Sequence, residues 1–303
     1  MTRARFFPFD YLVIGYSLAM IVLLLAVGRP LDAYLDEIVF YVAMIIVVLL
    51  IARFVDVRRE PLLTMLRLGY PVLLFTFFYR MTGGTMFLLF DRFFDAQLVA
   101  FERAIFGVSP TFFIEEHLLY TGLTELFMAG YFSYYFMIPG FVLWLLIRRH
   151  YDVLRRSVTA ICLTFFVSYP LFFLYPVEGP RWHFAGAYTH DITGPVFRPL
   201  VEFVIANGAV RGGCVPSTHT AVAIVIMMFC FKYYRRAGWL LLPVNICLAI
   251  GTFWGRYHYI SDVVIGIVIA VVSTIVVWRY YDRWDRTPME LIRSKKVPVT
   301  HAA

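Results

Sequence analysis

The sequence predicts an all-α, polytopic integral membrane helix bundle with about eight transmembrane helices. Of its 303 residues, 61% are hydrophobic and only 16% are charged, and the mean hydropathy is +0.75. Soluble domains carry roughly 25% charged residues. Apolar runs of about 20 residues, the length that crosses the hydrocarbon core of a bilayer, recur along the chain. The length fits one such bundle.

Eight apolar runs bounded by charged residues, Gly or Pro are the expected spans. They cover residues 11–27, 38–54, 62–79, 126–147, 158–175, 217–234, 239–254 and 262–280. The first resembles a signal sequence in length, but it has no clear small-x-small cleavage site and further spans follow it. We therefore interpret it as a retained anchor.

The distribution of Lys and Arg predicts the orientation. Most of the 27 basic residues fall before the first span, in alternate connections and after the last span. Because cytoplasmic segments carry the excess of positive charge, we expect both termini in the cytoplasm. A bacterial inner membrane is the expected location, since no organelle address is evident. The net charge of +7 then reflects topology, and no nucleic-acid partner is expected.

Two long connections lie on the opposite, outer side in this topology. Residues 80–125 alternate bulky apolar and charged side chains, which predicts amphipathic interfacial helices on the bilayer surface. Residues 177–215 are rich in Gly and Pro and are expected to be irregular backbone that lines a cavity. The four Cys residues have no spacing typical of a disulfide framework or a Cys-rich metal site.

Three short motifs place polar side chains at the ends of apolar spans. They are Glu178-Gly-Pro-Arg181, Gly212-Gly-Cys-Val-Pro-Ser-Thr-His219 and Gly255-Arg-Tyr-His-Tyr-Ile-Ser-Asp262. The first follows the fifth span, the second opens the sixth, and the third joins the seventh to the eighth. In a path that alternates across the membrane, all three emerge on the same outer face, so they can form one site.

His258 and Asp262 are four residues apart at the start of an expected helix, so their side chains lie one turn apart on one face. This spacing suits a nucleophile and its orienting carboxylate. A hydrogen bond from one imidazole nitrogen to Asp262 fixes the tautomer and leaves the other nitrogen free to attack phosphorus.

The second motif is typical of an anion site. Ser217, Thr218 and His219 open a helix after a Gly pair, where free backbone N–H groups and the positive end of the helix dipole suit a phosphate oxygen. Because an imidazole ordinarily titrates near neutrality, His219 is the expected general acid.

Arginines near the three motifs can hold a phosphoryl group. Arg181 and Arg256 can make bidentate contacts to its oxygens and offset charge in the transition state. Arg211 is a further candidate for the same role.

Each of these residues also has a structural alternative. A single His near a membrane interface is more often a boundary residue, Arg181 alone could be a snorkelling anchor, and Ser217 could be an ordinary N-cap. The combination favours a site, because ionisable groups near hydrocarbon cost roughly 2.5–3.5 kcal/mol each. His219, His258 and Asp262 could also supply three zinc ligands, but the nearby arginines would repel the ion. We therefore expect neither a metal nor another cofactor.

These motifs resemble those of the type-2 phosphatidic acid phosphatase superfamily. Its Pro-Ser-x-His motif corresponds to Pro216–His219, and its His-x-x-x-Asp ending corresponds to His258–Asp262. The resemblance covers about residues 80–280. It implies a phosphohistidine intermediate at His258, oriented by Asp262, with His219 as the acid, Arg and Ser groups that hold phosphate, and no cofactor.

The same resemblance divides the chain into three parts. We expect two added N-terminal helices in residues 1–60 and a catalytic, phosphatase-like membrane domain with a six-helix core in residues 61–282. A cytoplasmic basic tail is expected in residues 283–303.

Three positions depart from the superfamily pattern. Leu174 stands where the first motif usually has Lys, and Trp182 follows Arg181 where Pro is usual. Thr252 stands where the third motif usually has Arg. Together with Gly-Gly-Cys before the second motif, His258-Tyr259 in the third, and the upstream segments Phe101–Gly107 and Tyr131–Pro139, these departures resemble the branch that contains inositol phosphorylceramide synthase and sphingomyelin synthase. That branch includes phosphotransferases.

The expected function is a membrane lipid phosphate phosphatase whose site faces the periplasm or exterior. If a lipid or polyol hydroxyl replaces water as the acceptor, the same residues make a lipid phosphotransferase that resembles inositol phosphorylceramide synthase. A third possibility, from another class, is a non-catalytic lipid transporter or scaffold whose polar cluster only holds an anion. The motifs do not distinguish the first two, because the acceptor pocket lies outside them.

Overall fold

The structure of the protein, a computed structural model, describes residues 6–28, 30–55 and 61–285. The helices in these ranges are α1 (Pro8–Ala26), α2 (Leu35–Phe54), α3 (Pro61–Thr85), α4 (Asp95–Phe106), α5 (Pro110–His117), α6 (Thr121–Arg148), α7 (Tyr151–Leu174), α8 (Pro180–His183), α9 (Phe197–Gly208), α10 (Thr218–Tyr233), α11 (Arg235–Trp254) and α12 (Ile260–Trp284). A short 3-10 turn at Leu31–Tyr34 precedes α2. The predicted all-helical membrane bundle is confirmed.

Seven of these helices are long and apolar enough to cross a bilayer, namely α1, α2, α3, α6, α7, α11 and α12. The eighth expected span is α10, which is apolar but has only 16 residues. At a rise of about 1.5 Å per residue it reaches about 24 Å, less than the roughly 30 Å of a hydrocarbon core.

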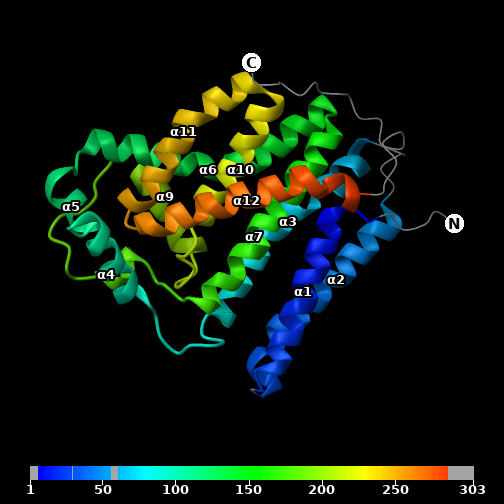
Figure 1. The fold of residues 1–303 in the computed structure, drawn as a ribbon, viewed down its shortest axis with the longest axis horizontal. Coiled ribbons are helices and arrows are strands. Elements are labelled where there is room, and N and C mark those ends of the chain that lie inside the picture. Colours follow the sequence, from blue (N-terminus) through cyan, green and yellow to red (C-terminus); the bar gives the residue numbers. More distant parts are fainter. Residues whose placement is uncertain (1–5, 29, 56–60, 286–303) are drawn as a thin grey trace.

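The helix α7 forms the centre of the bundle. It packs against α1, α3, α10 and α12, and 72% of its apolar window is buried. The helices α1 and α2 pair with each other on one side of α7 (Figure 1). A buried ion pair between Asp10 and Arg67 links α1 to α3, and the hydroxyl of Tyr70 donates to the same carboxylate at 2.5 Å.

The helices α6 and α11 approach closely because glycines face the neighbouring helix. A Cβ atom at Gly130 would lie 2.5 Å from the Cβ of Cys247. A Cβ at Gly251 would lie 2.4 Å from the carbonyl oxygen of Phe127. This contact places the N-terminal half of α6 beside the end of α11, where the third motif begins.

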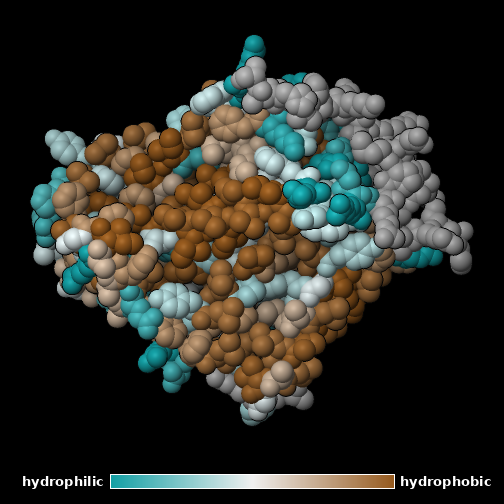
Figure 2. All heavy atoms as spheres, in the orientation of Figure 1, coloured by the Kyte–Doolittle hydropathy of each residue, from teal (hydrophilic) through white to brown (hydrophobic). Residues whose placement is uncertain are grey.

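The surface of the bundle is largely apolar. Figure 2 shows apolar side chains across the middle of the face in view, with polar side chains gathered toward its left and right margins. Large apolar side chains such as Phe54 and Leu240, which are 72% and 73% exposed, belong to this surface. Such a band fits contact with lipid.

The helices α4, α5 and α9 lie at one end of the bundle, which we call the capped end (Figure 1). The expectation of amphipathic helices in residues 80–125 agrees with α4 and α5, whereas the expectation of irregular backbone throughout residues 177–215 was wrong, because this segment contains the 12-residue α9. The carboxylate of Glu125 accepts the amide hydrogens of Val196, Phe197 and Arg198. A side chain from α6 thus satisfies the free N–H groups of α9.

The opposite end of the bundle carries charged pairs between helix termini. Arg155 near the start of α7 donates to Asp285 at 2.5 Å, and Arg156 donates to Asp282 near the end of α12 at 2.5 Å. Residues 1–5 and 286–303 lie outside the described residues, so the expected tail is described only as far as Asp285.

Candidate active site

The three sequence motifs meet at the capped end through backbone hydrogen bonds. The bonds are from Arg181 N–H to the Arg256 carbonyl (2.8 Å), from Ser217 N–H to the Asp262 carbonyl (3.1 Å) and from Cys214 N–H to the Val177 carbonyl (3.2 Å). The first two bonds each join two different motifs, and the third ties the second motif to the residue just before the first. The prediction that the motifs converge agrees with this geometry.

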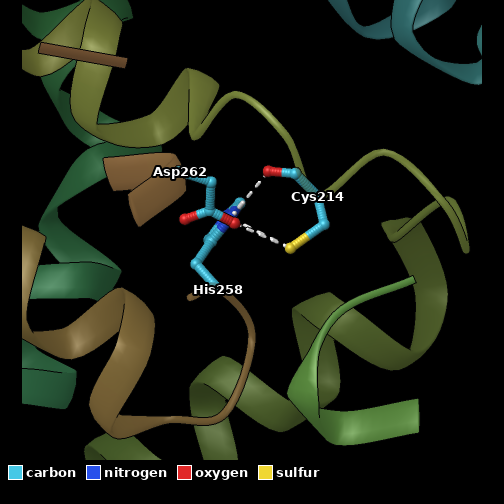
Figure 3. Close-up of side chains that lie close together, drawn as sticks. All are labelled: Cys214, His258 and Asp262. Carbon is cyan, nitrogen blue, oxygen red and sulfur yellow. Dashed lines mark hydrogen bonds and ion pairs between the residues drawn. The ribbon is translucent and has the colours of Figure 1, made fainter. Parts of the chain in front are cut away.

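The imidazole of His258 is held through its Nδ1 atom. Nδ1 lies 3.0 Å from the carbonyl oxygen of Cys214 and 3.2 Å from Oδ2 of Asp262. The thiol of Cys214 donates to the same Asp262 oxygen at 2.8 Å (Figure 3). Asp262 is fully buried and His258 is 5% exposed. These contacts orient the ring and place its Nε2 atom on the side away from Asp262.

Ser217 and Thr218 form the N-terminus of α10 beside the start of α12. Ser217 is the N-cap residue, but its hydroxyl does not cap the helix and instead contacts the hydroxyl of Thr220 at 3.2 Å. A Cβ at position 266 would lie 2.5 Å from the carbonyl oxygen of Ser217, so only Gly266 lets α12 approach this closely. No side chain of the described residues caps α10, so its first N–H groups can donate to an anion.

His219 lies at the start of α10 and faces His258. The two ring centroids are 5.9 Å apart. The hydroxyl of Tyr131 lies 3.3 Å from Nε2 of His219, and the ring of Tyr134 packs against it at 4.5 Å. Nδ1 of His219 is buried and has no hydrogen-bond partner among the described residues.

Arg181 reaches a carboxylate that the sequence analysis did not single out. Its Nη2 lies 2.8 Å from Oε2 of Glu202 in α9, and its Nη1 is buried without a hydrogen-bond partner among the described residues. Arg198 contacts the other oxygen of Glu202 at 2.9 Å. The i,i+4 spacing of Arg198 and Glu202 was a sequence signal for their pairing, but it was missed because residues 177–215 were expected to be irregular.

Arg256, an expected phosphate ligand, is engaged by the segment around Tyr188. Its guanidinium stacks on the Tyr188 ring at 3.6 Å, donates to the His190 carbonyl at 2.8 Å and lies 3.7 Å from Glu115. Its backbone has a positive φ of 66°. These contacts indicate that Arg256 holds the connection before α9 against α5.

Arg211, the further candidate, lies at the surface. Its guanidinium pairs with Glu178, with a distance of 2.8 Å from Nε to Oε2, and 57% of its side chain is exposed. It also lies 5.3 Å from the Trp182 ring. The structure therefore places Arg211 beside the first motif, with its charge already paired.

Two acidic residues of α4 support the site from outside the motifs. Asp95 accepts hydrogen bonds from the amides of Glu178 and Gly179, each at 2.9 Å. Glu102 accepts from the amide and hydroxyl of Ser261 at 2.7 and 2.8 Å. The sequence showed both as charges of an amphipathic segment, but their partners lie too far along the chain to be inferred.

The departures from the superfamily pattern leave two positions uncharged. Thr252 is fully buried, and its carbonyl accepts hydrogen bonds from the amides of Tyr257 and His258. Leu174 is 47% exposed. Neither position supplies a cation to the site.

Two groups of side chains have ligand-type atoms close enough to share a metal ion, Cys214 with His258 and Asp262, and Asp95 with Glu178 and His183. In the first group the thiol and the imidazole already contact the same carboxylate oxygen. In the second, Asp95 already accepts amide hydrogens and Glu178 pairs with Arg211. These polar atoms satisfy one another, and the expectation of a metal-free site stays a prediction.

Comparison with known proteins defines the class of this protein. The chain belongs to the PAP2 superfamily, whose sequence model matches residues 96–276. All the candidate site residues fall within this segment.

Similar individual proteins cover the chain only in part. A PA-phosphatase related-family protein of Dictyostelium discoideum is 25% identical over 160 residues, which are 46% of this chain and 29% of that protein. The bacitracin transport permease protein BcrC of Bacillus licheniformis is 30% identical over 86 residues, 28% of this chain and 39% of that protein. The chain thus spans well under half the length of either relative. No solved structure matches it significantly.

Proposed function

We propose that this protein is a membrane lipid phosphate phosphatase that acts through a phosphohistidine at His258 on the extracytoplasmic face. One observation carries the proposal: the His258 imidazole is fixed through Nδ1 by Asp262 and the Cys214 carbonyl, with the His219 ring 5.9 Å away. An oriented nucleophile near a second imidazole that can act as acid and base suits phosphoryl transfer through nitrogen.

In the first half of the reaction, Nε2 of His258 attacks phosphorus and the bond from phosphorus to the lipid oxygen breaks. Asp262 stabilises the positive charge that develops on the imidazole. Protonated His219 gives its proton to the leaving oxygen, which departs as the lipid alcohol. Arg181 and the N-terminal amides of α10, next to Ser217, hold the remaining phosphoryl oxygens.

In the second half, water attacks the phosphohistidine. Neutral His219 accepts a proton from this water, so the acid of the first step is the base of the second. The bond between phosphorus and Nε2 breaks, inorganic phosphate leaves, and His258 returns to its starting state. The complete cycle consumes one lipid phosphate and one water molecule and releases the lipid alcohol and inorganic phosphate.

The membrane setting and the superfamily support a phosphorylated lipid as the substrate. The site lies at one end of a bundle with seven candidate spans. A relative is named as PA-phosphatase related, and we carry this over only as support for the class of substrate. The placement of Lys and Arg supports an extracytoplasmic site and cytoplasmic termini.

A second candidate is transfer of the phosphoryl or head group to a lipid or polyol hydroxyl, as in the inositol phosphorylceramide synthase-like branch. Leu174, Trp182 and Thr252 favour it, because they depart from the usual superfamily pattern. The names of the two relatives give this branch no support. A non-catalytic transporter or scaffold would use the same polar cluster without turnover.

The test incubates purified protein with a panel of lipid phosphates and phospholipids, with and without inositol, diacylglycerol and ceramide, in the absence of added metal. Mass spectrometry of the lipids, with an assay for free phosphate, identifies the products. Free phosphate together with the dephosphorylated lipid supports hydrolysis, an acceptor that has gained the phosphoryl or head group supports transfer, and the absence of turnover supports the scaffold.

Two variants test the nucleophile. We expect His258→Ala to abolish turnover and His219→Ala to accumulate acid-labile phosphate on His258. His117→Ala is the matched control, because His117 lies on α5 at the capped end and its side chain is 56% exposed. Unchanged turnover in His258→Ala would remove the proposed nucleophile.

A further inference from the structure

Two guanidinium groups converge on one carboxylate next to Tyr257 of the third motif. Arg181 Nη2 lies 2.8 Å from Oε2 of Glu202, and Arg198 Nη2 lies 2.9 Å from Oε1. Both guanidiniums also face the ring of Tyr257, at 6.0 and 5.8 Å from its centroid. Tyr257 directly precedes His258 in the chain, so this cluster packs on a residue of the third motif.

The hydroxyl of Tyr257 closes the cluster. It accepts a hydrogen bond from Arg198 Nη1 at 2.7 Å and donates one to Glu202 Oε1 at 2.6 Å. The side chains of Arg181, Arg198 and Glu202 are 31%, 17% and 29% exposed, so they are accessible to a ligand. Arg181 Nη1 is buried and has no partner among the described residues, which leaves a donor for an additional anion.

The cluster is also connected to the proposed acid. The Tyr257 ring lies 5.1 Å from the ring of Tyr131, whose hydroxyl lies 3.3 Å from Nε2 of His219. Arg198 is therefore linked to His219 through two tyrosine side chains, although it belongs to a different helix.

The guanidinium groups of the other nearby arginines contact residues outside this cluster. Arg256 stacks on Tyr188 and donates to His190, and Arg211 pairs with Glu178 at the surface. A phosphate monoester dianion is best held by more than one guanidinium, because charge-assisted bonds to several oxygens share its charge. Among these arginines, Arg198 is the one whose guanidinium shares a carboxylate with that of Arg181.

We propose that Arg198 joins Arg181 in binding the phosphoryl oxygens of the substrate, and that Glu202 is the counter-ion that holds both guanidiniums until a phosphate displaces it. This inference rests on the proposed function. The carboxylate keeps two like charges close together in the absence of substrate. It competes with phosphate for the same N–H donors, so removing its charge strengthens phosphate binding, whereas removing Arg198 weakens it.

The experiment tests whether the two substitutions change phosphate affinity in opposite directions. The dissociation constant of inorganic phosphate is measured by calorimetry for the detergent-purified full-length protein and for Arg198→Gln and Glu202→Gln. We expect Arg198→Gln to weaken binding roughly 10- to 100-fold, the effect of losing a charge-assisted hydrogen bond, and Glu202→Gln to tighten it. Arg103→Gln is the matched control, because it removes the same charge from an exposed position on α4 and should change affinity less than about twofold.

A purely structural role for the cluster predicts a different result, namely that Glu202→Gln weakens phosphate binding as much as Arg198→Gln does. That result would overturn the proposal, as would phosphate affinity in Arg198→Gln equal to that of the parent. Arg198→Lys keeps the charge without the planar fork and should fall between the parent and Arg198→Gln. This variant keeps the test decisive if Arg198→Gln does not fold.

Turnover of a lipid phosphate by the same proteins separates the two proposals. A parent that hydrolyses lipid phosphate, together with an Arg198→Gln variant of unchanged KM and phosphate affinity, overturns the role of Arg198 alone. A parent that neither hydrolyses lipid phosphate nor binds inorganic phosphate overturns the proposed function, and this inference with it.

Discussion

The hydroxyl of Tyr259 donates a hydrogen bond to Oδ1 of Asp95 at 2.9 Å, joining the residue after His258 to the first residue of α4. Asp95 also accepts the amide hydrogens of Glu178 and Gly179. One buried carboxylate thus fixes the first motif relative to the third. Asp95 acts on the site through the positions of other residues.

Replacing Asp95 should therefore impair both stability and turnover. Asp95→Ala leaves two amides and a hydroxyl without their acceptor, which we expect to cost about 3 kcal/mol of folding free energy. The readouts are the melting temperature in detergent and kcat. Asp91→Ala is the control, because Asp91 is exposed in the segment before α4. Equal melting temperatures for the two variants would contradict the proposed role of Asp95.

The thiol of Cys214 should be unreactive near neutral pH. Burial, and then the neighbouring Asp262 carboxylate, raise the pKa of this thiol well above its usual value, so the reactive thiolate is scarce. In a variant with Cys162, Cys230 and Cys247 replaced by Ala, we expect alkylation by N-ethylmaleimide to stay slow between about pH 7 and 9. The same chain, denatured, should react faster as pH rises through this range. Equal rates for folded and denatured protein would contradict this prediction.

Tyr131→Phe tests the contact between the Tyr131 hydroxyl and Nε2 of His219. Loss of one hydrogen bond of about 1 kcal/mol should lower kcat roughly fivefold and shift the limb of the pH–rate profile that reports His219, with little change in KM. The ring of Tyr134 also packs against His219, and its hydroxyl makes no hydrogen bond to that imidazole in the described structure. Tyr134→Phe is therefore the control, and an equal effect in both variants would refute a specific role for the Tyr131 hydroxyl.

The lowered pKa of Glu115 should make the stability of the folded protein depend on pH in acid. Burial alone would raise the pKa of Glu115, but amide hydrogen bonds from His190 and Thr189, together with nearby Arg256, outweigh it and hold the pKa below its ordinary value of 4.5. A lowered carboxyl pKa stabilises the folded state above about pH 4.5, and this contribution is lost as pH falls through the folded-state pKa. The melting temperature of the parent should therefore fall in acid below about pH 4.5.

The Glu115→Gln variant should be less stable than the parent at neutral pH, and its melting temperature should depend less on acid. Glu116→Gln is the matched control, because the adjacent Glu116 side chain is 65% exposed. Parallel melting curves for the parent and Glu115→Gln from about pH 3 to 7 would contradict the assignment.

The sequence predicted the bundle well, because helices that cross a membrane must be long and apolar. The apolar run that forms α7, for example, can be identified from its composition alone, without knowledge of its tertiary contacts. It was less informative about the capped end. The helix α9 depends on the carboxylate of Glu125 from α6 for its N-terminal donors. Residues 197–205 do place Phe197, Leu200, Val201, Val204 and Ile205 at helical spacing, but the Gly and Pro residues around them led to an expectation of irregular backbone.

The site was predictable where spacing along one helix determines geometry, as for His258 and Asp262. It was not predictable where partners come from separate helices. Arg256 lies two residues before His258 in sequence, yet its guanidinium turns to Tyr188. Arg198 lies 60 residues before His258, yet it reaches Tyr257. Side-chain direction decides these cases, and a sequence motif does not specify it.

The short helix α10 stops before its neighbour at the end away from the site. Its first turn is level with the start of α12, because the Ser217 amide donates to the Asp262 carbonyl. Its last turn, at Lys232, lies beside the Trp278 ring at 4.1 Å, before α12 ends at Trp284. The shortfall of about 6 Å against a full hydrocarbon core therefore falls at the Lys232 end, where a long ammonium side chain can extend from an apolar helix toward the polar boundary. The reacting groups keep the level of a full-length span, and a thicker bilayer would be met at the opposite end of α10.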